Sequence, residues 1–372
     1  MKIKSISAKD NRTGWNINNV QFNPMLTLFV GASGVGKTKV LNVIKVLARI
    51  AKGESYNAIE WNVVFEQAGR NYIWEGEFDS VDGQAQKIID LDDTEGRVSI
   101  FREQITDNGK VLVKRSSEAI FYKDEKLVKL DNTKSVVALL KGESSIEPIY
   151  KGFQQCYDLD TTANIISLST IVDVGKRPLN LTLIKALRMF SPLERFFLLH
   201  ENKLKEFDII CQKFYDIFPN VKEIGFTLVK SFDEKFIPLL RIREENVAAW
   251  IEQLDISSGM WRTLIQIITL VLANDGDVIM IDEFENGLGV NCINELADLI
   301  MDPETDVQVI MTSHHPYIIN AIPVNDWKIL TRNGCDVHVH TAEQLNIGEH
   351  SKHEAFMQLL QTPEYKTGQN RN

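Results

Sequence analysis

The sequence predicts an α/β fold with a mixed sheet, and three stretches of the chain support this class. An apolar run over residues 26–30 leads into a glycine-rich turn and then into a segment with helical periodicity. A second apolar run, residues 277–283, ends in two carboxylates, as is typical of a buried parallel strand. Short alternating runs over residues 61–130, with a hairpin turn at Asn108 and Gly109, predict an antiparallel lobe.

Composition and charge narrow the class of protein. The chain has 372 residues and is 44% hydrophobic, enough for one large core or two lobes. No apolar run approaches the roughly 18 residues of a membrane span, no export signal precedes the first predicted strand, and the cysteines lack disulfide spacing. We therefore expect a cytoplasmic protein without membrane contact. The net charge of −10 disfavours a general polyanion binder, although a local basic patch would still allow contact with nucleic acid.

Residues 31–38 fit the phosphate-binding pattern G-x-x-x-x-G-K-[ST] without a mismatch. Glycines let such a loop turn its N–H groups toward phosphate oxygens, and the helix that follows adds partial positive charge. We expect Lys37 to reach the β- and γ-phosphates and the Thr38 hydroxyl to ligate Mg²⁺. Helical periodicity continues to Ile50, and Gly53 predicts the end of that helix. The predicted nucleotide-binding residues are Gly31, Ala32, Ser33, Gly34, Val35, Gly36, Lys37 and Thr38.

Asp282 and Glu283 end the predicted strand over residues 277–283. We expect Asp282 to hold Mg²⁺ and its water. Glu283 is expected to polarise the attacking water, because phosphoryl transfer needs mainly positioning and charge stabilisation from the protein. The chain has no N-K-x-D motif to read guanine, which favours ATP over GTP. These residues predict a Mg²⁺-dependent ATP hydrolase.

A second anion site is predicted at residues 256–260, Ile-Ser-Ser-Gly-Met, directly before a helical apolar run. Ser257, Ser258 and Gly259 would present N–H groups at the N-terminus of that helix. One chain does not need two sites for a γ-phosphate, unless the second completes the nucleotide site of another subunit. The pattern therefore predicts a nucleotide that is shared between two subunits.

Together these motifs resemble those of ABC-type ATPases, in particular the soluble RecF/SMC-like branch of the AAA-type proteins. Residues 256–260 are similar to the signature L-S-G-G-Q, residues 285–288 to the D-loop, and residues 312–316 to the switch-histidine loop. The order of the motifs also fits that family, and the resemblance is strongest over residues 1–50 and 250–332. It implies an ABC-ATPase head with an antiparallel β lobe and an inserted, compact helical subdomain.

The sequence departs from the family pattern at several positions. Ser258 and Met260 replace a glycine and the glutamine of the signature, and Gly289 follows the D-loop where relatives often have His-Pro. The glutamine of the Q-loop stays unassigned, because Gln154 and Gln155 both lie at a suitable distance along the chain.

The resemblance implies two catalytic residues, Glu283 and His314, the second as the switch histidine. His315 is the alternative, but it lies directly before Pro316 and would then help to end the strand. We also considered His338 and His340, which alternate on a predicted strand near other histidines. Histidine pairs on surface strands are commoner than sets of metal ligands, so we expect no metal there.

The predicted domains are residues 1–132, the P-loop and the antiparallel lobe; 133–250, a mainly helical insertion; and 251–372, the second half of the ATPase head. The clearest helix of the insertion begins with a capping box at Ser191 and Glu194 and is expected to run to Pro219. It is too short for an SMC-type arm, which needs long heptad repeats. Residues 366–372 are expected to form a frayed tail.

The resemblance also implies partners. A head-to-tail homodimer, or a higher homo-oligomer, would close around ATP and open on hydrolysis. Its output would be a conformational signal to DNA or to a separate effector protein, a nuclease or toxin, as in anti-phage defence, since too few residues follow Pro316 for a fused Toprim nuclease. The alternatives are a DNA-repair ATPase of the RecF type, a nucleotide-gated scaffold with little turnover, and the nucleotide-binding subunit of a transporter.

Overall fold

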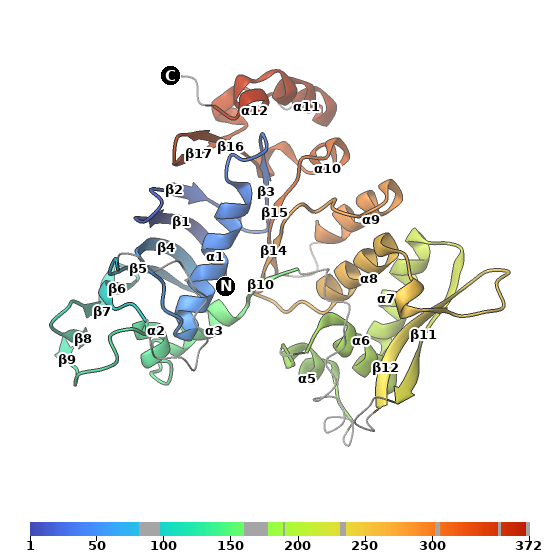
Figure 1. Ribbon diagram of the computed structural model, residues 1–372, viewed down its shortest axis with the longest axis horizontal. Coiled ribbons are helices and arrows are strands. Elements are labelled where there is room, and N and C mark those ends of the chain that lie inside the picture. Colours follow the sequence, from blue (N-terminus) through green and yellow to red (C-terminus); the bar gives the residue numbers. More distant parts are fainter. Residues whose placement is uncertain are drawn as a thin grey trace. The chain divides into compact units, whose positions relative to one another are not determined.

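The computed structural model describes residues 1–81, 97–159, 178–188, 190–230, 236–301, 306–348 and 351–369 (Figure 1). The chain divides into two compact units. The sheet unit consists of Met1–Asp158, Asp275–Phe284 and Asp306–Asn372, and the helical unit of Leu159–Asn274 and Glu285–Thr305. The domain boundaries expected at residues 132 and 250 stay a prediction.

The sheet unit is built on one large mixed sheet, which confirms the predicted fold class. Its parallel part contains, in spatial order, β10 (Cys156–Asp158), β14 (Val278–Ile281), β15 (Gln308–Thr312), β3 (Leu26–Val30) and β16 (Trp327–Asn333). These central strands are buried almost throughout, as expected for strands covered on both faces. They bring the end of β3, where the P-loop begins, beside the ends of β14 and β15.

The sheet continues from β16 into a mainly antiparallel part. Its strands, in spatial order, are β17 (Asp336–Thr341), β2 (Asn16–Gln21), β1 (Lys2–Asp10), β4 (Ile59–Gln67), β5 (Arg70–Phe78), β6 (Ile100–Asp107), β7 (Lys110–Arg115), β8 (Ile120–Tyr122) and β9 (Glu125–Lys126). Asn108 and Gly109, both with positive φ, form the turn between β6 and β7, which confirms the predicted hairpin.

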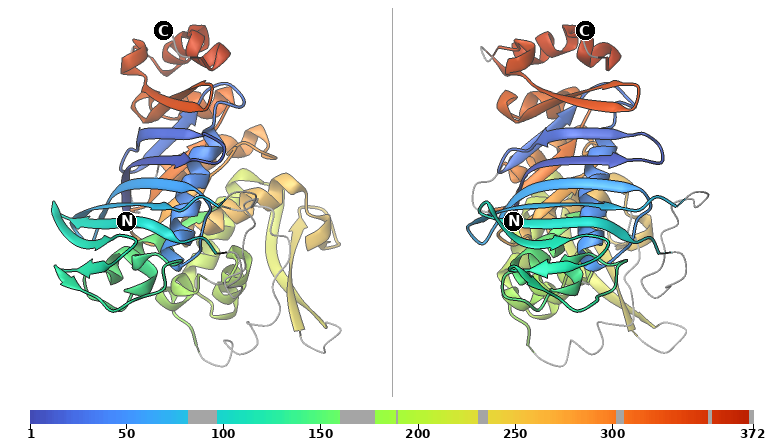
Figure 2. Two further views of the ribbon diagram at one scale, coloured as in Figure 1. Left: turned by 60° about the vertical axis from the view of Figure 1, so that its left-hand side comes forward. Right: turned by 90° about the vertical axis from the view of Figure 1, so that its left-hand side faces the viewer.

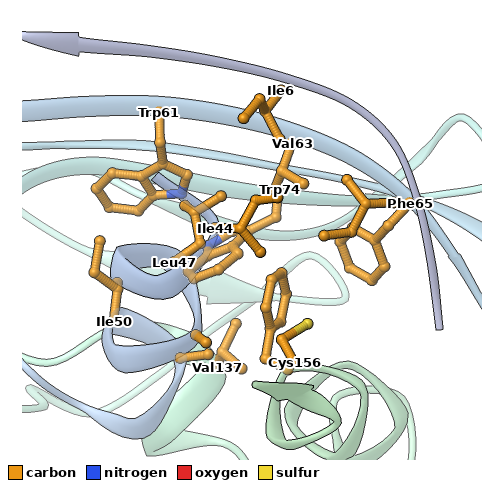
Figure 3. Close-up of a cluster of buried hydrophobic side chains, with 14 of the residues drawn as sticks. Ile6, Ile44, Leu47, Ile50, Trp61, Val63, Phe65, Trp74, Val137 and Cys156 are labelled. Atoms are coloured by element: carbon orange, nitrogen blue, oxygen red, sulfur yellow. The ribbon is translucent and has the colours of Figure 1, made fainter. Parts of the chain in front are cut away.

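Helix α1 (Lys37–Lys52) packs across the sheet and holds the P-loop (Figure 1). Its buried face carries Ile44 and Leu47, which lie against aromatic residues of β4 and β5 such as Trp61 and Trp74 (Figure 3). Gly53, at φ 104°, ends the helix as predicted, since this left-handed conformation favours glycine. Helices α2 (Val136–Leu139) and α3 (Glu147–Gln154) also pack against α1.

The helical unit contains α5 (Leu181–Ala186), α6 (Pro192–Glu201), α7 (Lys205–Ile217), α8 (Ser258–Val271) and α9 (Val290–Ile300), with a small sheet of β11 (Val221–Lys230), β12 (Phe236–Glu244) and β13 (Ile251–Glu252). The short η1 helix (Gln253–Asp255) leads into α8. The predicted capping box is present, with the Ser191 hydroxyl accepting from the Glu194 N–H. The single helix predicted up to Pro219 is wrong: α6 and α7 are separated at Lys203, whose φ is 51°.

The stripe of apolar residues that predicted the single helix continues at helical spacing past the break at Lys203, which explains the error. Phe196 and Phe207, on α6 and α7, stack with their ring centroids 4.7 Å apart. Burial raises the pKa of the Cys211 thiol on α7 to about 12. The stripe is therefore a core face that two helices share.

The C-terminal part of the sheet unit contains α10 (Pro316–Ala321), η2 (Val324–Asp326), η3 (Glu343–Leu345), α11 (Lys352–Gln361) and α12 (Pro363–Thr367). Figure 2 shows α11 and α12, in red, beside β16 and β17. The expected frayed tail is wrong up to residue 369, because α12 includes Lys366 and Gly368 is buried. Residues 370–372 lie outside the described residues. No helix among the described residues is long and apolar enough to cross a membrane.

Candidate nucleotide-binding and hydrolysis site

The loop over residues 31–38 has the backbone form that its glycines predict. Gly31, Gly34 and Gly36 have φ values of 144°, 79° and 109°, a region that glycine enters without strain. A side-chain carbon at Gly31 would lie 2.6 Å from the carbonyl oxygen of Leu330, so the loop can approach β16 only with glycine at this position. Successive N–H groups in loops of this kind form an anion-binding concavity.

Lys37 lies within this loop. Its Nζ donates to the carbonyl oxygens of Gly31, at 2.8 Å, and of Ala32, at 3.0 Å. The residue begins α1, and the preceding Gly36 provides no side-chain acceptor for the first N–H groups of the helix. Ammonium and helix N–H groups are donors that a phosphate can accept from.

Asp282 connects two strand ends to α1. Its Oδ1 accepts hydrogen bonds from the hydroxyl of Thr312, at 2.7 Å, and from the hydroxyl of Thr38, at 3.2 Å. Asp282 directly follows β14 and Thr312 ends the neighbouring β15. A hydroxyl and a carboxylate so close together are hard oxygen donors of the type that Mg²⁺ prefers. The residues present therefore fit a Mg²⁺ ion bound beside a nucleotide.

Glu283 has a left-handed backbone with φ 47°, which is uncommon for a residue other than glycine. The Thr312 hydroxyl accepts a hydrogen bond from its N–H at 2.8 Å, and the Phe284 N–H donates to the Thr312 carbonyl at 3.1 Å. The turn places Phe284 in the core and leaves the Glu283 side chain exposed at the sheet edge. The carboxylate can thus act outside the sheet while its backbone is held in place.

The sequence motif did not reveal the role of Thr312. This residue is 1% exposed, and one hydroxyl orients the Asp282 carboxylate while accepting from the Glu283 N–H. The one sequence feature that could have pointed to Thr312 is its position at the start of the expected switch-histidine loop. Only the pairing of β14 with β15 shows that it lies against both acids.

The two candidate switch histidines differ in environment. His314 is exposed and directly follows the buried end of β15. His315 precedes Pro316 and forms the N-cap position of α10, while its N–H donates to the Ser313 hydroxyl at 3.0 Å. Its ring stacks on Tyr317 with centroids 5.4 Å apart. These contacts fix His315 at the start of α10, and His314 stays the predicted switch histidine.

The candidates for the Q-loop lie at the wrong end of a strand. Gln154 ends α3 and Gln155 precedes β10, which runs parallel to β14 with Cys156 opposite Val278. The Gln155 carbonyl accepts from the Val278 N–H at 2.9 Å, at the start of β14, whereas Asp282 follows its end. Neither glutamine therefore belongs to the edge that carries the acids. Residues 160–177, which follow β10, contain no glutamine.

The predicted signature lies in the first turn of α8, in the helical unit. The Ser257 hydroxyl accepts from the Met260 N–H at 3.3 Å, and Ser258 and Gly259 begin the helix. The first N–H groups of a helix have no acceptor within the helix, so this end can bind an anion. The three predicted residues Ser257, Ser258 and Gly259 thus share one helix start.

The same helix start packs on the predicted D-loop. A side-chain carbon at Gly259 would lie 3.2 Å from the Gly287 carbonyl oxygen. Arg262, one turn further along α8, donates from Nη1 to the Asn286 carbonyl at 2.7 Å. A shift of either segment will therefore move the other. Arg262 was not among the residues predicted from sequence.

His338 and His340 both lie on β17. His340 Nε2 lies 3.1 Å from the Thr331 hydroxyl. Within the described parts of the chain, no group of three or more His, Cys, Asp and Glu side chains could hold a metal ion.

A comparison with family models matches residues 177–320 to the family described as "AAA domain, putative AbiEii toxin, Type IV TA system". The matched segment contains the signature, both acids, the D-loop and His314, and it ends within α10. No curated protein sequence matches the chain.

Two solved structures show a remote likeness. One is described as "Crystal structure of the SmcHead bound to the C-winged helix domain of ScpA", with 12% identity, 91% of this chain and 97% of that chain covered, and a TM-score of 0.49. The other is the SMC head domain from Thermotoga maritima, with 13% identity, 92% and 99% coverage, and a TM-score of 0.43. At these TM-scores neither structure decides a property of this chain.

Proposed function

We propose, on the premise that this chain is an ABC-type AAA ATPase, that two copies close around Mg²⁺–ATP and reopen on hydrolysis. The observation that carries the proposal is the set of hydrogen bonds joining Thr38, Asp282, Thr312 and Glu283 at the start of the P-loop helix. It supports the proposal, because it brings two hard oxygen donors and an exposed carboxylate together at one sheet edge.

In the sheet unit, separate residues bind the phosphates and hold the metal ion. Lys37 exchanges its two backbone acceptors for the β- and γ-phosphates, so its charge stays within the loop. Thr38 and Asp282 would hold Mg²⁺, which neutralises charge on the phosphates. Thr312 keeps the Asp282 carboxylate turned toward Thr38. This arrangement needs little movement when the nucleotide binds.

Glu283 accepts the proton of the attacking water and aligns that water with the γ-phosphate. Its exposed side chain and fixed backbone suit this role, because a strained residue is held only where its neighbours determine its position. His314, which is also exposed, contacts the γ-phosphate, and this contact is lost when the γ-phosphate leaves. Hydrolysis therefore changes contacts at the ends of β14 and β15.

The nucleotide site is completed by the helix start of a second copy. Ser257, Ser258 and Gly259 present the N-terminus of α8, and Arg262 and Gly287 join that end to the D-loop. A second phosphate-binding helix end suits an oligomer, in which the signature of one copy faces the P-loop of another. Closure would then depend on ATP being present in the shared site.

The biological role that we propose is defence against phage by a toxin–antitoxin type of system. The description of the matched family contains the words "Type IV TA system", which supports the toxin–antitoxin part of this role, and the part in phage defence rests on the resemblance of the motifs. The chain would act as the ATPase, and its opening and closing would control a separate effector protein, a nuclease or toxin. DNA is the other candidate target of the conformational signal.

Mixing two inactive variants tests the shared site. Lys37→Ala should prevent nucleotide binding, whereas Ser257→Arg should bind ATP but block closure, because a bulky cation would occupy the place of the γ-phosphate. In a heterodimer of the two variants, one site contains both lesions and the other contains neither. Phosphate release should return when the two proteins are mixed.

Subunit exchange must be confirmed with labelled chains, and closure followed by the distance between labels on the two copies. Restored hydrolysis in the mixture, with none in either variant alone, supports a site shared between copies. No recovery despite confirmed exchange would refute the shared site. A wild-type protein that binds no ATP would refute the whole proposal.

A further inference from the structure

The C-terminal residues 363–369, which we call the clasp, pack on the P-loop. The clasp consists of α12 and the two residues after it, and Gly368 ends the helix with φ 68°. The N–H of Arg332 on β16 donates to the Gly368 carbonyl at 2.6 Å. Since β16 is the neighbour of β3, this bond anchors the clasp beside the strand that leads into the loop.

Gly368 packs directly against Ala32 and Val35 of the P-loop. A side-chain carbon at residue 368 would overlap the Cγ1 methyl of Val35 and would lie 3.2 Å from Cβ of Ala32. Val35 is itself 4% exposed, so it has little space to move away. The clasp therefore limits where the middle of the P-loop can lie.

Arg332 makes a second connection between the clasp and the loop. Its backbone binds Gly368, and its Nη1 donates to the carbonyl of Gly34 at 3.0 Å. Its guanidinium carbon lies 5.3 Å from the centre of the Trp15 ring, and that ring faces Gly36, at 3.3 Å from where a side-chain carbon would be. One arginine thus joins the clasp directly to Gly34, and its other contact is the Trp15 ring that lies against Gly36.

A cavity borders the same contact. It has a volume of about 330 Å³ and is lined by Ser33 and Gly34 of the loop and by Thr367 and Gln369 of the clasp. The P-loop and the clasp therefore line one cavity, and a displacement of the clasp changes the space that is available to the P-loop.

We propose that the clasp positions the P-loop for the nucleotide, with Gly368 and Arg332 as its positioning residues. This inference rests on the proposed function, because it concerns regulation of the same ATP site. The loop must keep its turned backbone, with three glycines at positive φ, before the phosphates bind, and contacts made in advance reduce the ordering that binding requires. A partner that lifts the clasp would lower the affinity for ATP without touching the nucleotide.

Two glycine substitutions separate this role from a general loss of stability. Gly368→Ala and Gly69→Ala both place alanine at a positive φ, 68° and 72°, so both carry a similar backbone cost. Residue 69, in the turn between β4 and β5, faces open space, whereas residue 368 faces Val35. We expect Gly368→Ala to raise the Kd for ATP, measured by titration calorimetry, by about tenfold, as an overpacked contact would. Gly69→Ala should bind like wild type at a similar melting temperature.

A compensating change tests whether the effect passes through the loop. Val35→Ala removes the methyl group that an alanine at residue 368 would overlap. The double variant Gly368→Ala with Val35→Ala should therefore bind ATP as Val35→Ala alone does. If the double variant keeps the full tenfold loss, or if Gly368→Ala and Gly69→Ala bind ATP equally, the proposal is overturned.

If Gly368→Ala does not fold, Arg332 gives the deciding measurement. Arg332→Ala removes the bond to the Gly34 carbonyl but keeps the backbone bond to Gly368, and Arg332→Lys retains a donor. We expect Arg332→Ala to weaken ATP binding about fivefold at an unchanged melting temperature, and Arg332→Lys to recover most of it. Wild-type affinity in Arg332→Ala would overturn the proposal. A wild-type protein that binds no ATP refutes the proposed function instead.

Discussion

The P-loop and the signature are two glycine-containing turns that lead into helices, yet they use glycine differently. In the P-loop, Gly31, Gly34 and Gly36 all have positive φ, and Gly36 leaves the start of α1 without a side-chain cap. In the signature, Gly259 is part of the helix, and the Ser257 hydroxyl already accepts from the Met260 N–H. The first turn forms a curved loop, and the second presents the end of a helix.

The second glycine is needed for close packing. Gly259 lies against the Gly287 carbonyl, so the signature and the D-loop meet without an intervening side chain. A curved loop can enclose phosphates within one chain, whereas an exposed helix end needs a ligand brought to it. If the proposed function is correct, nucleotide affinity should reside in the P-loop, and the signature should contribute to closure. Four substitutions test this division.

The largest effect on ATP affinity is expected from Lys37→Ala. The change removes a charge that lies within the loop and that we expect to bind the β- and γ-phosphates. We expect a loss of ATP affinity of about 100-fold or more in titration calorimetry, as for lost charge-assisted hydrogen bonds. Lys45→Ala, on the same helix, is the matched control and should bind ATP normally. Tight binding by Lys37→Ala would contradict the role of the loop.

Glu283→Gln should separate binding from chemistry. The exposed carboxylate is expected to accept a proton from water, so its amide should slow phosphate release by about 10²–10⁴-fold. ATP affinity should remain close to wild type, and the closed dimer should live longer in light scattering. The matched control is Glu295→Gln on α9, which is also exposed. Turnover at the wild-type rate would remove Glu283 from the catalytic role.

Thr312→Val should have an intermediate effect. The substitution keeps the shape of the buried side chain but removes the hydroxyl that orients Asp282 and accepts from the Glu283 N–H. Loss of such a supporting contact at a metal site reduces activity by about 10- to 100-fold. We also expect half-maximal turnover to need more Mg²⁺. Thr312→Ser should restore most of the activity, and equal defects in both variants would indicate a packing fault instead.

Arg262→Ala should have the smallest effect, and it tests the signature side of the comparison. The change removes the bond from α8 to the Asn286 carbonyl, worth ~1 kcal/mol, so closure and turnover should fall about fivefold. ATP affinity in the monomer should not change, because the P-loop is intact. A loss of monomer affinity as large as the loss of turnover would show that the two regions are not separate in function.

Features that depend only on residues close by in the sequence were predicted correctly. The loop over residues 31–38, the helix end at Gly53 and the turn at Asn108 and Gly109 all have the backbone that their local residues require. The error at Lys203 has the opposite cause, since the apolar period continues through the break and gives no sign of it. The packed position of Gly368 was equally hidden, because it depends on Val35, which is distant in the sequence.

The sequence by itself determined which chemical groups the site contains: a phosphate-binding loop, two acids after an apolar strand, and a second helix start with small residues. Only the tertiary structure decided which of these groups touch. Thr312 and Asp282 are 30 residues apart in the chain, and their hydrogen bond exists because β14 and β15 are parallel neighbours in one register. The pairing of β10 with β14 places Gln155 at the opposite strand end. Hydrogen bonds act over about 3 Å, so the pairing of strands, and not their order along the chain, determines the site.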